Sequence, residues 1–163
     1  MRVLPVLDRN HMDHLPILLA EDNEDDAFLL ERALRKAGMP NPLRVVPDGE
    51  QAIAYLKGEG RYADRAAHPF PALVLLDIKM PRMNGLETLS VIRNDPVLRR
   101  LVVIFLTSSN QEQDINDAFD LRANSYLVKP RSAEGMVSVL AKFKAYWLGL
   151  NQFPSFAADM ATA

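Results

Sequence analysis

The strongest constraint on the fold of this chain is a short apolar run that ends in a carboxylate. Residues 71–76 read Pro-Ala-Leu-Val-Leu-Leu, and Asp77 follows. An unbroken apolar run of this length is typical of a strand that is buried on both faces of a parallel sheet. Residues 17–20, Ile-Leu-Leu-Ala, repeat the pattern and lead into Glu21 and Asp22. If these strands share one crevice, the repulsion between their carboxylates requires a cation or a shared proton.

Strand-like and helix-like segments alternate five times along the chain. Strands are predicted at residues 17–20, 43–46, 73–77, 102–106 and 126–128, and helices begin near residues 24, 50, 85, 109 and 132. This alternation predicts a flavodoxin-like, doubly wound (βα)5 α/β fold with helices on both faces of a parallel sheet. In the strand order 2-1-3-4-5 the first and third strands flank the ligand crevice, and these are the two strands that end in acid.

Length and composition indicate one ordinary globular domain of 163 residues, of which 48% are apolar and 25% charged. The net charge of −2 gives no reason to expect binding to nucleic acid or to a membrane surface. The chain has no cysteine, which excludes a thiol nucleophile, and its three histidines do not cluster at ligand spacing. With no long apolar run and no signal-peptide pattern, we expect a cytoplasmic protein.

Three regions are expected: an N-terminal extension over residues 1–14, the main domain over 15–147, and a C-terminal tail over 148–163. The end of the chain is rich in large apolar side chains, namely Tyr146, Trp147, Leu148, Leu150, Phe153 and Phe156. Such a concentration would be unusual on the surface of a monomer. The tail therefore either folds back over its own domain or meets a partner, and we expect it to be the arm of a homodimer.

The predicted strand ends carry a set of groups that suits phosphate chemistry: Glu21 and Asp22, Asp77, Thr107 and Lys129. Three acids alone could bind a magnesium or calcium ion. Acids together with a lysine and a hydroxyl group suggest a site for a metal and a phosphoryl group at once. A carboxylate can also be the nucleophile in phosphoryl transfer, with lysine and threonine binding the phosphoryl oxygens.

In these residues the chain resembles the receiver domain of bacterial two-component response regulators, over about residues 15–147. The matching motifs are the acidic pair 21–22, Leu-Asp-Ile-Lys-Met-Pro-Arg-Met-Asn-Gly at 76–85, Thr-Ser at 107–108 and Tyr-Leu-Val-Lys-Pro at 126–130. The spacings also fit the family, because Thr107 follows Asp77 by 30 residues and Lys129 follows Thr107 by 22.

The resemblance implies a phosphoacceptor and a magnesium site. Asp77 would accept a phosphoryl group from a histidine kinase. Asp22 would be the principal Mg²⁺ ligand, joined by Asp77 and the backbone carbonyl of Lys79, and Glu21 would contribute through water.

The resemblance also implies a switch. Thr107 and Lys129 would bind the phosphoryl group, and Tyr126 would be an aromatic switch whose rotamer follows Thr107. Phosphorylation would then reorganise the face formed by the fourth helix, fifth strand and fifth helix. The Lys129–Pro130 peptide bond is expected to be cis.

A narrower resemblance links the chain to stand-alone, phytochrome-associated response regulators. It rests on the acidic segment 21–26, on the long loop after the second helix with Gly-Glu-Gly at 58–60, and on residues 143–147. Those proteins lack an output domain and often dimerise through the helix 4–strand 5–helix 5 side and their C-terminal extensions. The resemblance implies a histidine kinase, with a phytochrome-type kinase as one candidate, and a homodimer.

Other functions are compatible with parts of this pattern. A hydrolase of aspartyl-phosphate type would need an acid at position 79, where this chain has Lys79, so we expect a signalling protein and not an enzyme. A flavodoxin-like cofactor site is opposed by the acidic loop 21–26, which would repel an anion. A receiver-like binding module that is not phosphorylated and an intermediate in a phosphorelay both stay open.

Three local predictions concern helix ends. Asp25 and Asp26 are interpreted as acids of a first helical turn, where they favour the helix dipole. Ser109 and Glu112 fit a capping box. Arg122 stands where family members usually have glycine, so a left-handed conformation there would cost about 1–2 kcal/mol unless the helix ends at Asn124 instead.

Overall fold

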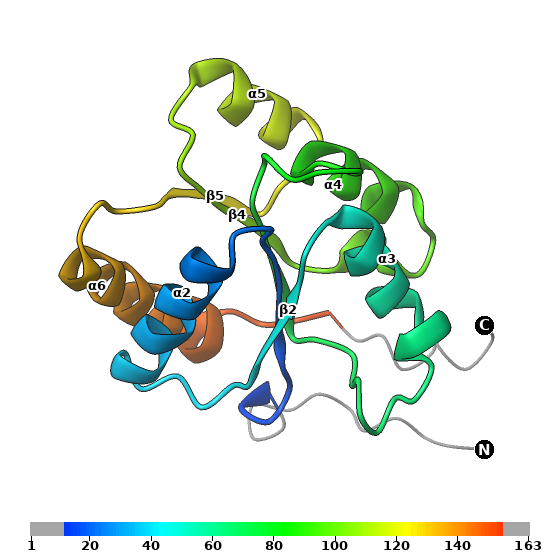
Figure 1. Ribbon diagram of the computed structural model, residues 1–163, viewed down its shortest axis with the longest axis horizontal. Coiled ribbons are helices and arrows are strands. Elements are labelled where there is room, and N and C mark those ends of the chain that lie inside the picture. Colours follow the sequence, from blue (N-terminus) through cyan, green and yellow to red (C-terminus); the bar gives the residue numbers. More distant parts are fainter. Residues whose placement is uncertain (1–11, 155–163) are drawn as a thin grey trace.

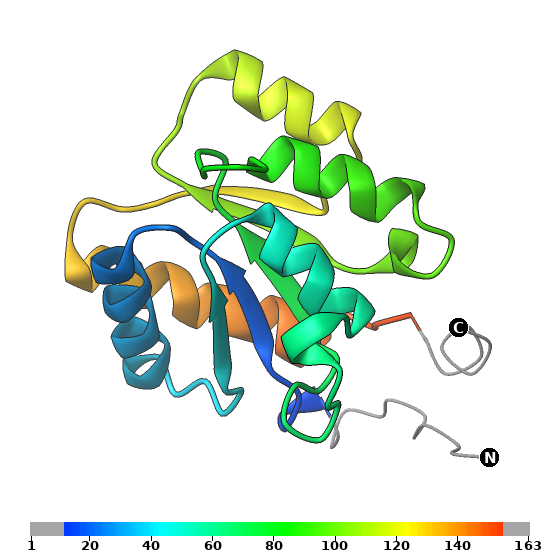
Figure 2. The ribbon, with the colours of Figure 1, turned by 45° about the vertical axis from the view of Figure 1, so that its right-hand side comes forward.

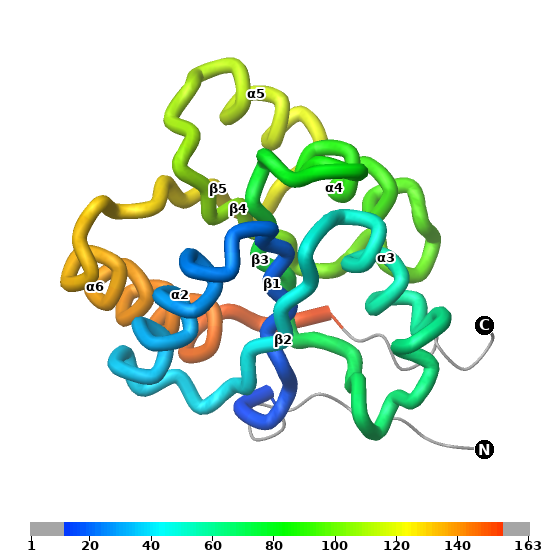
Figure 3. Tube along the Cα trace, viewed as in Figure 1, coloured from blue at the N-terminus to red at the C-terminus, as the bar shows by residue number. Residues whose placement is uncertain are grey.

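The computed structural model describes residues 12–154, and its centre is a five-stranded parallel sheet of order β2-β1-β3-β4-β5 (Figure 1). The strands are β1 Ile17–Ala20, β2 Leu43–Val46, β3 Leu73–Leu76, β4 Val103–Thr107 and β5 Ser125–Val128. The predicted fold and strand order are confirmed. Figure 3 shows β1 and β3 side by side in the middle of the molecule, and in their register Ala20 pairs with Leu76. The acids that follow these two residues, Glu21 and Asp77, therefore lie next to each other at the same edge of the sheet.

Helices cover both faces of the sheet (Figure 2). The helices α2 Glu24–Lys36 and α6 Ala133–Phe143 lie on one face, and α3 Gly49–Lys57, α4 Gly85–Asn94 and α5 Glu112–Asp120 lie on the other. Successive strand residues point to opposite faces. In β1, Leu18 and Ala20 join the core under α3, α4 and α5, whereas Ile17 and Leu19 join the core under α2 and α6. This two-sided burial explains why the strands read as unbroken apolar runs.

Four of the five predicted helices begin within one residue of the expected position. The side chains of Asn23, Asp48 and Ser132 accept hydrogen bonds from backbone N–H groups in the first turns of α2, α3 and α6. The capping box predicted at Ser109 and Glu112 is wrong. Helix α5 begins with no side-chain cap, because the Ser109 hydroxyl donates to Asp114 and accepts from the Gln111 N–H instead.

The long loop after α3 is organised by Arg65. Its guanidinium donates to the carbonyl oxygens of Tyr55, Leu56 and His68 at 2.6–3.1 Å, which satisfies the carboxyl end of α3. The rings of Tyr55, Tyr62 and His68 pack together at centroid distances of 5.1–5.8 Å. A polar loop of this length therefore has a small core of its own.

Two backbone features bear on the predictions. None of the described residues forms a cis peptide bond, so the cis bond expected at Lys129–Pro130 is wrong and the bond is trans, which is the form that most X–Pro bonds favour. Arg122 does take the left-handed conformation, with φ of 64°, and its carbonyl accepts a hydrogen bond from the buried Arg93. A second left-handed arginine, Arg82 with φ of 63°, was not foreseen.

The C-terminal segment folds back on the domain as far as it is described. Residues Lys144–Leu150 extend α6 as a π-helix. Trp147, Leu148 and Phe153 pack against the core under α2 and α6, whereas Tyr146 and Leu150 are 52% and 70% exposed. Phe156 lies outside the described residues. Among the described residues, no helix has both the length and the apolar character needed to cross a membrane.

Candidate phosphoacceptor and metal site

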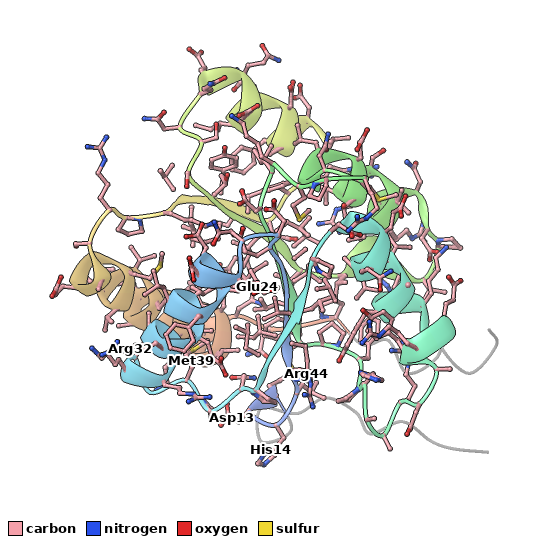
Figure 4. The ribbon with its side chains drawn as sticks, viewed as in Figure 1. Asp13, His14, Glu24, Arg32, Met39 and Arg44 are labelled. Atoms are coloured by element: carbon pink, nitrogen blue, oxygen red, sulfur yellow. The ribbon has the colours of Figure 1, made fainter. Side chains whose placement is uncertain are left out.

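Three carboxylates meet where β1 and β3 end. Oxygens of Glu21, Asp22 and Asp77 all lie within 4.8 Å of one another. Glu21 and Asp77 are buried, and Asp22 is exposed. Neither described histidine belongs to this cluster, and Figure 4 shows His14 and Asp13 at the opposite end of the molecule. Oxygen ligands of this kind and number suit a hard divalent cation, so the donor set fits the magnesium site that the sequence predicted.

The position of Asp77 is fixed by its backbone neighbours. Its N–H donates to the carbonyl of Ala20 at 3.1 Å, and its Oδ1 accepts from the N–H of Ile78 at 2.7 Å. Gly85 packs directly on its carbonyl, since a Cβ added to Gly85 would lie 2.1 Å from the Asp77 oxygen. The Gly85 N–H also donates to Ile78 O at 2.8 Å. The glycine that closes the motif at 76–85 is therefore required by a close approach to Asp77.

Lys129 supplies the positive charge of the site. Its Nζ lies 2.5 Å from Glu21 Oε2 and 3.4 Å from Asp77 Oδ2. Burial alone would lower the pKa of Lys129, but the hydrogen bond to Glu21 and the charges of the surrounding acids outweigh it and raise this pKa. Burial raises the pKa of Glu21, against the lowering effect of the hydrogen bond from Lys129. The lysine thus offsets part of the carboxylate repulsion in the absence of a metal.

Asp26 also belongs to the site, although its position in the sequence suggested only a first-turn acid. Its Oδ2 lies 3.3 Å from Lys129 Nζ. The signal available in the sequence was its place in the first turn of a helix that begins directly after the acidic pair 21–22, which keeps Asp26 near the same edge of the sheet.

Thr107 and Tyr126 lie beside the acids, on β4 and β5. Thr107 is 2% exposed, and its Oγ1 accepts from the Ser109 N–H at 3.3 Å. The Tyr126 ring packs against Phe105 with the centroids 5.8 Å apart, and its hydroxyl donates to the carbonyl of Ser109 at 3.0 Å. Burial raises the pKa of Tyr126. Ser109 therefore connects the two residues through its backbone.

Lys79 lies in the loop between β3 and α4, and its side chain is exposed. Six of the seven predicted site residues thus lie at or just after the ends of β1, β3, β4 and β5, and the seventh, Tyr126, lies within β5, where it pairs with Phe105. The alternation of strands and helices predicts that the strand ends share one edge, whereas Lys79 and Tyr126 were expected only from the resemblance to receiver domains.

A groove of about 1060 Å³ opens beside this edge, between α2 and α6. Glu21, Asp26 and Lys129 line its inner end, and Leu29 and Arg32 line the side formed by α2. Figure 4 shows Arg32 on α2, away from the sheet. Leu29 is 54% exposed. The site is therefore continuous with this groove.

Residues 17–141 match the model of the response regulator receiver domain. This chain belongs to that family. The receiver domain is 32% identical to the response regulator Rcp1 of Synechocystis sp., covering 85% of this chain and 92% of Rcp1. It is 37% identical to the probable methanogenesis regulatory protein FilR2 of Methanothrix harundinacea, over 87% of this chain and 89% of FilR2. The family is one of signalling proteins, as the sequence predicted.

Solved receiver structures agree with this assignment. The phosphorylated cyanobacterial phytochrome response regulator RcpA superposes with a TM-score of 0.79 at 36% identity, over 87% of this chain and 99% of RcpA. The response regulator RPA3017, from red light signalling of R. palustris, gives a TM-score of 0.82 at 37% identity over 86% and 99%. The Mn²⁺-bound form of Rcp1 gives 0.76 at 32% identity over 86% and 99%. The predicted resemblance to phytochrome-associated response regulators is confirmed.

Proposed function

We propose that this receiver domain is a single-domain response regulator that accepts a phosphoryl group from a histidine kinase on Asp77, with Mg²⁺ as the required ion. The observation that carries the proposal is the position of Asp77 beside two further acids and Lys129. Oxygens of the three acids are within 4.8 Å of one another, and Lys129 Nζ is 3.4 Å from Asp77 Oδ2. The existence of a Mn²⁺-bound form of the related Rcp1 supports the binding of a divalent ion by this chain.

In the proposed reaction the Asp77 carboxylate attacks the phosphorus of a phosphohistidine. A P–O bond forms to Asp77 as the P–N bond breaks, and the released imidazole takes up a proton from solvent. Glu21, Asp22, Asp77 and the Lys79 carbonyl would hold Mg²⁺. When bound, Mg²⁺ would neutralise part of the negative charge shared by the carboxylates and the phosphoryl oxygens.

Lys129 and Thr107 then bind the phosphoryl oxygens. The Lys129 ammonium group lies between Glu21 and Asp77, at 2.5 and 3.4 Å. It therefore needs only a small movement to exchange a carboxylate oxygen for an oxygen of a phosphoryl group on Asp77. The Thr107 hydroxyl oxygen accepts from the Ser109 N–H, so its O–H can donate to a phosphoryl oxygen. Both groups stabilise charge that develops during the transfer.

The same residues connect phosphorylation to the surface. When Thr107 turns toward the phosphoryl group, its contact with the Ser109 N–H changes, and the Ser109 carbonyl is the acceptor for Tyr126. We infer that phosphorylation shifts the populations of two arrangements of this loop and of the α5–β5–α6 face.

We further propose that the protein is a homodimer in the cytoplasm. We also propose that the histidine kinase that phosphorylates it is of the phytochrome type. The kinase assignment rests on the relatives RcpA and RPA3017, a phytochrome response regulator and a protein of red light signalling. The dimer is suggested by large apolar side chains that stay exposed on α5, β5 and the C-terminal segment, namely Phe119, Val128, Tyr146 and Leu150. Removing residues 148–163 should halve the molecular mass in solution, and an unchanged mass would contradict the proposed arm.

Phosphoryl acceptance can be tested without knowing the kinase. The protein is incubated with acetyl phosphate and Mg²⁺, and its intact mass is recorded. We expect a gain of one phosphoryl group that requires Mg²⁺ and is lost in Asp77→Asn. A modification that persists in this variant, or no modification of the wild type, would refute the proposal and favour a binding module that is not phosphorylated.

A further inference from the structure

An ion pair outside the acid cluster holds the loop that follows Asp77. Arg82 Nε lies 2.8 Å from Asp48 Oδ2, and its Nη2 makes a second, shorter bond to the same oxygen. The Asp48 side chain is fully buried, whereas that of Arg82 is 54% exposed. The other carboxylate oxygen, Oδ1, accepts from the Gln51 N–H at 2.9 Å. A buried carboxylate needs such partners, because an unpaired charge in that position is costly.

The backbone supports the same contact. The Gly49 N–H donates to the carbonyl of Met83 at 3.1 Å. A Cβ on Gly49 would lie 1.9 Å from Thr88 Oγ1 and 2.7 Å from Met83 O, so the two loops approach as closely as glycine allows. Arg82 reaches Asp48 from a left-handed backbone conformation, which is unfavourable for arginine unless its surroundings compensate. The contact between Arg82 and Asp48 is such a compensation.

The segment between Asp77 and Gly85 is therefore fixed at two places. The two ends of the segment are joined, because the Gly85 N–H donates to the Ile78 carbonyl and Gly85 packs on the Asp77 carbonyl. In its middle, Arg82 is anchored to Asp48 on the turn that precedes α3. Lys79 lies between these two anchors.

We propose that Asp48 and Arg82 are positioning residues for the metal site: by anchoring the loop, they hold the Lys79 backbone carbonyl where a divalent cation at Asp22 and Asp77 can use it. The inference rests on the proposed function. Neither residue belongs to the acid cluster, so both act through the loop. Outer partners that orient metal ligands typically change metal affinity by about 10–100-fold when they are removed.

The test measures Mg²⁺ binding to the full chain by isothermal titration calorimetry, at a temperature where circular dichroism shows every variant folded. Arg82→Gln and Asp48→Asn should each weaken Mg²⁺ binding about tenfold. Asparagine keeps an acceptor for the Gln51 N–H, so Asp48→Asn removes the charge but keeps the hydrogen bond that caps the N-terminus of α3. The double variant should be no weaker than either single variant, because the pair acts as one unit. Arg82→Lys should recover part of the affinity.

A matched control separates positioning from general stability. Arg65→Gln removes the contacts at the far end of α3 and should lower the melting temperature while leaving the Mg²⁺ affinity unchanged. Equal affinity in wild type, Arg82→Gln and Asp48→Asn, with binding lost in Asp22→Asn, would overturn this inference alone. A wild-type protein that binds no Mg²⁺ would overturn both the inference and the proposed metal site.

Discussion

Replacing Asp22 by asparagine should stabilise the protein without metal and destabilise it, relative to wild type, with metal. The side chain of Asp22 is exposed, so the substitution disturbs no packing. It removes one of three like charges whose oxygens lie within 4.8 Å of one another. It also removes the residue proposed as the principal Mg²⁺ ligand. The two effects on the free energy of unfolding have opposite signs, so the stability of Asp22→Asn relative to wild type depends on whether Mg²⁺ is bound.

The size of the first effect follows from the distances. Two unit charges 4.8 Å apart repel by about 0.9 kcal/mol in bulk water and by about 3.5 kcal/mol at an effective dielectric constant of 20. Asp22 is exposed, which favours the lower value, and Lys129 beside Glu21 and Asp77 cancels part of the repulsion. We therefore expect Asp22→Asn to raise the free energy of unfolding by about 1 kcal/mol in EDTA, or about 2–4 °C in melting temperature.

Thermal unfolding in EDTA and in Mg²⁺ checks both effects. At a Mg²⁺ concentration 100 times its Kd, the wild type should gain about 2.7 kcal/mol, and Asp22→Asn should gain almost nothing, so the order of stability inverts. Asp25→Asn is the control, since it removes a nearby acid, in the first turn of α2, that does not belong to the cluster. It should lose up to about 1 kcal/mol in either buffer and keep the Mg²⁺ response. A variant Asp22→Asn that is less stable than wild type in EDTA, or that keeps the full Mg²⁺ gain, would refute the reasoning.

Three further predictions concern the backbone and the core. Arg122→Gly should raise the free energy of unfolding by about 0.5–1 kcal/mol in urea titrations, because relief of a left-handed arginine exceeds the added chain entropy of glycine; a loss of stability would contradict it. Gly85→Ala should cost about 3 kcal/mol and abolish acetyl phosphate labelling, since its Cβ would lie 2.1 Å from the Asp77 carbonyl, whereas Gly149→Ala, whose Cβ meets nothing closer than 3.8 Å, should be tolerated in the same assays. Arg93→Met should cost about 3 kcal/mol in urea, because it leaves the buried Leu101 carbonyl and two partly buried carbonyl groups without this donor, and a loss below about 1 kcal/mol would count against that role.

The features that the sequence predicted well are local ones. Each central strand is a short apolar run, and the helix starts expected near residues 24, 50 and 132 depend only on the residues of one turn. Of the two common doubly wound strand orders, 2-1-3-4-5 is the one expected here because it places both acid-ended strands beside the crevice, and the site followed because polar residues end four parallel strands at one edge. Periodicity and capping are encoded within a few residues, so the chain itself displays them.

The features that were missed depend on contacts between distant parts of the chain. Asp26 meets Lys129 across 103 positions, and Arg82 meets Asp48 across 34. No pattern within a few residues of sequence predicts pairs that are so far apart in the chain. Ser109 was assigned to a cap from its spacing, but it bonds Asp114 instead, since a hydroxyl in a loop has several acceptors within reach.

The most direct test of the central claim identifies the residue that carries the phosphoryl group. The protein is phosphorylated with acetyl phosphate and Mg²⁺, and sodium borohydride then reduces the acyl phosphate to a homoserine residue, which peptide mass spectrometry locates. We predict homoserine at position 77 and at no other acid of the site, with none formed when Mg²⁺ is omitted. Reduction at Glu21, Asp22 or Asp26, or phosphorylation that leaves Asp77 intact, would contradict the account.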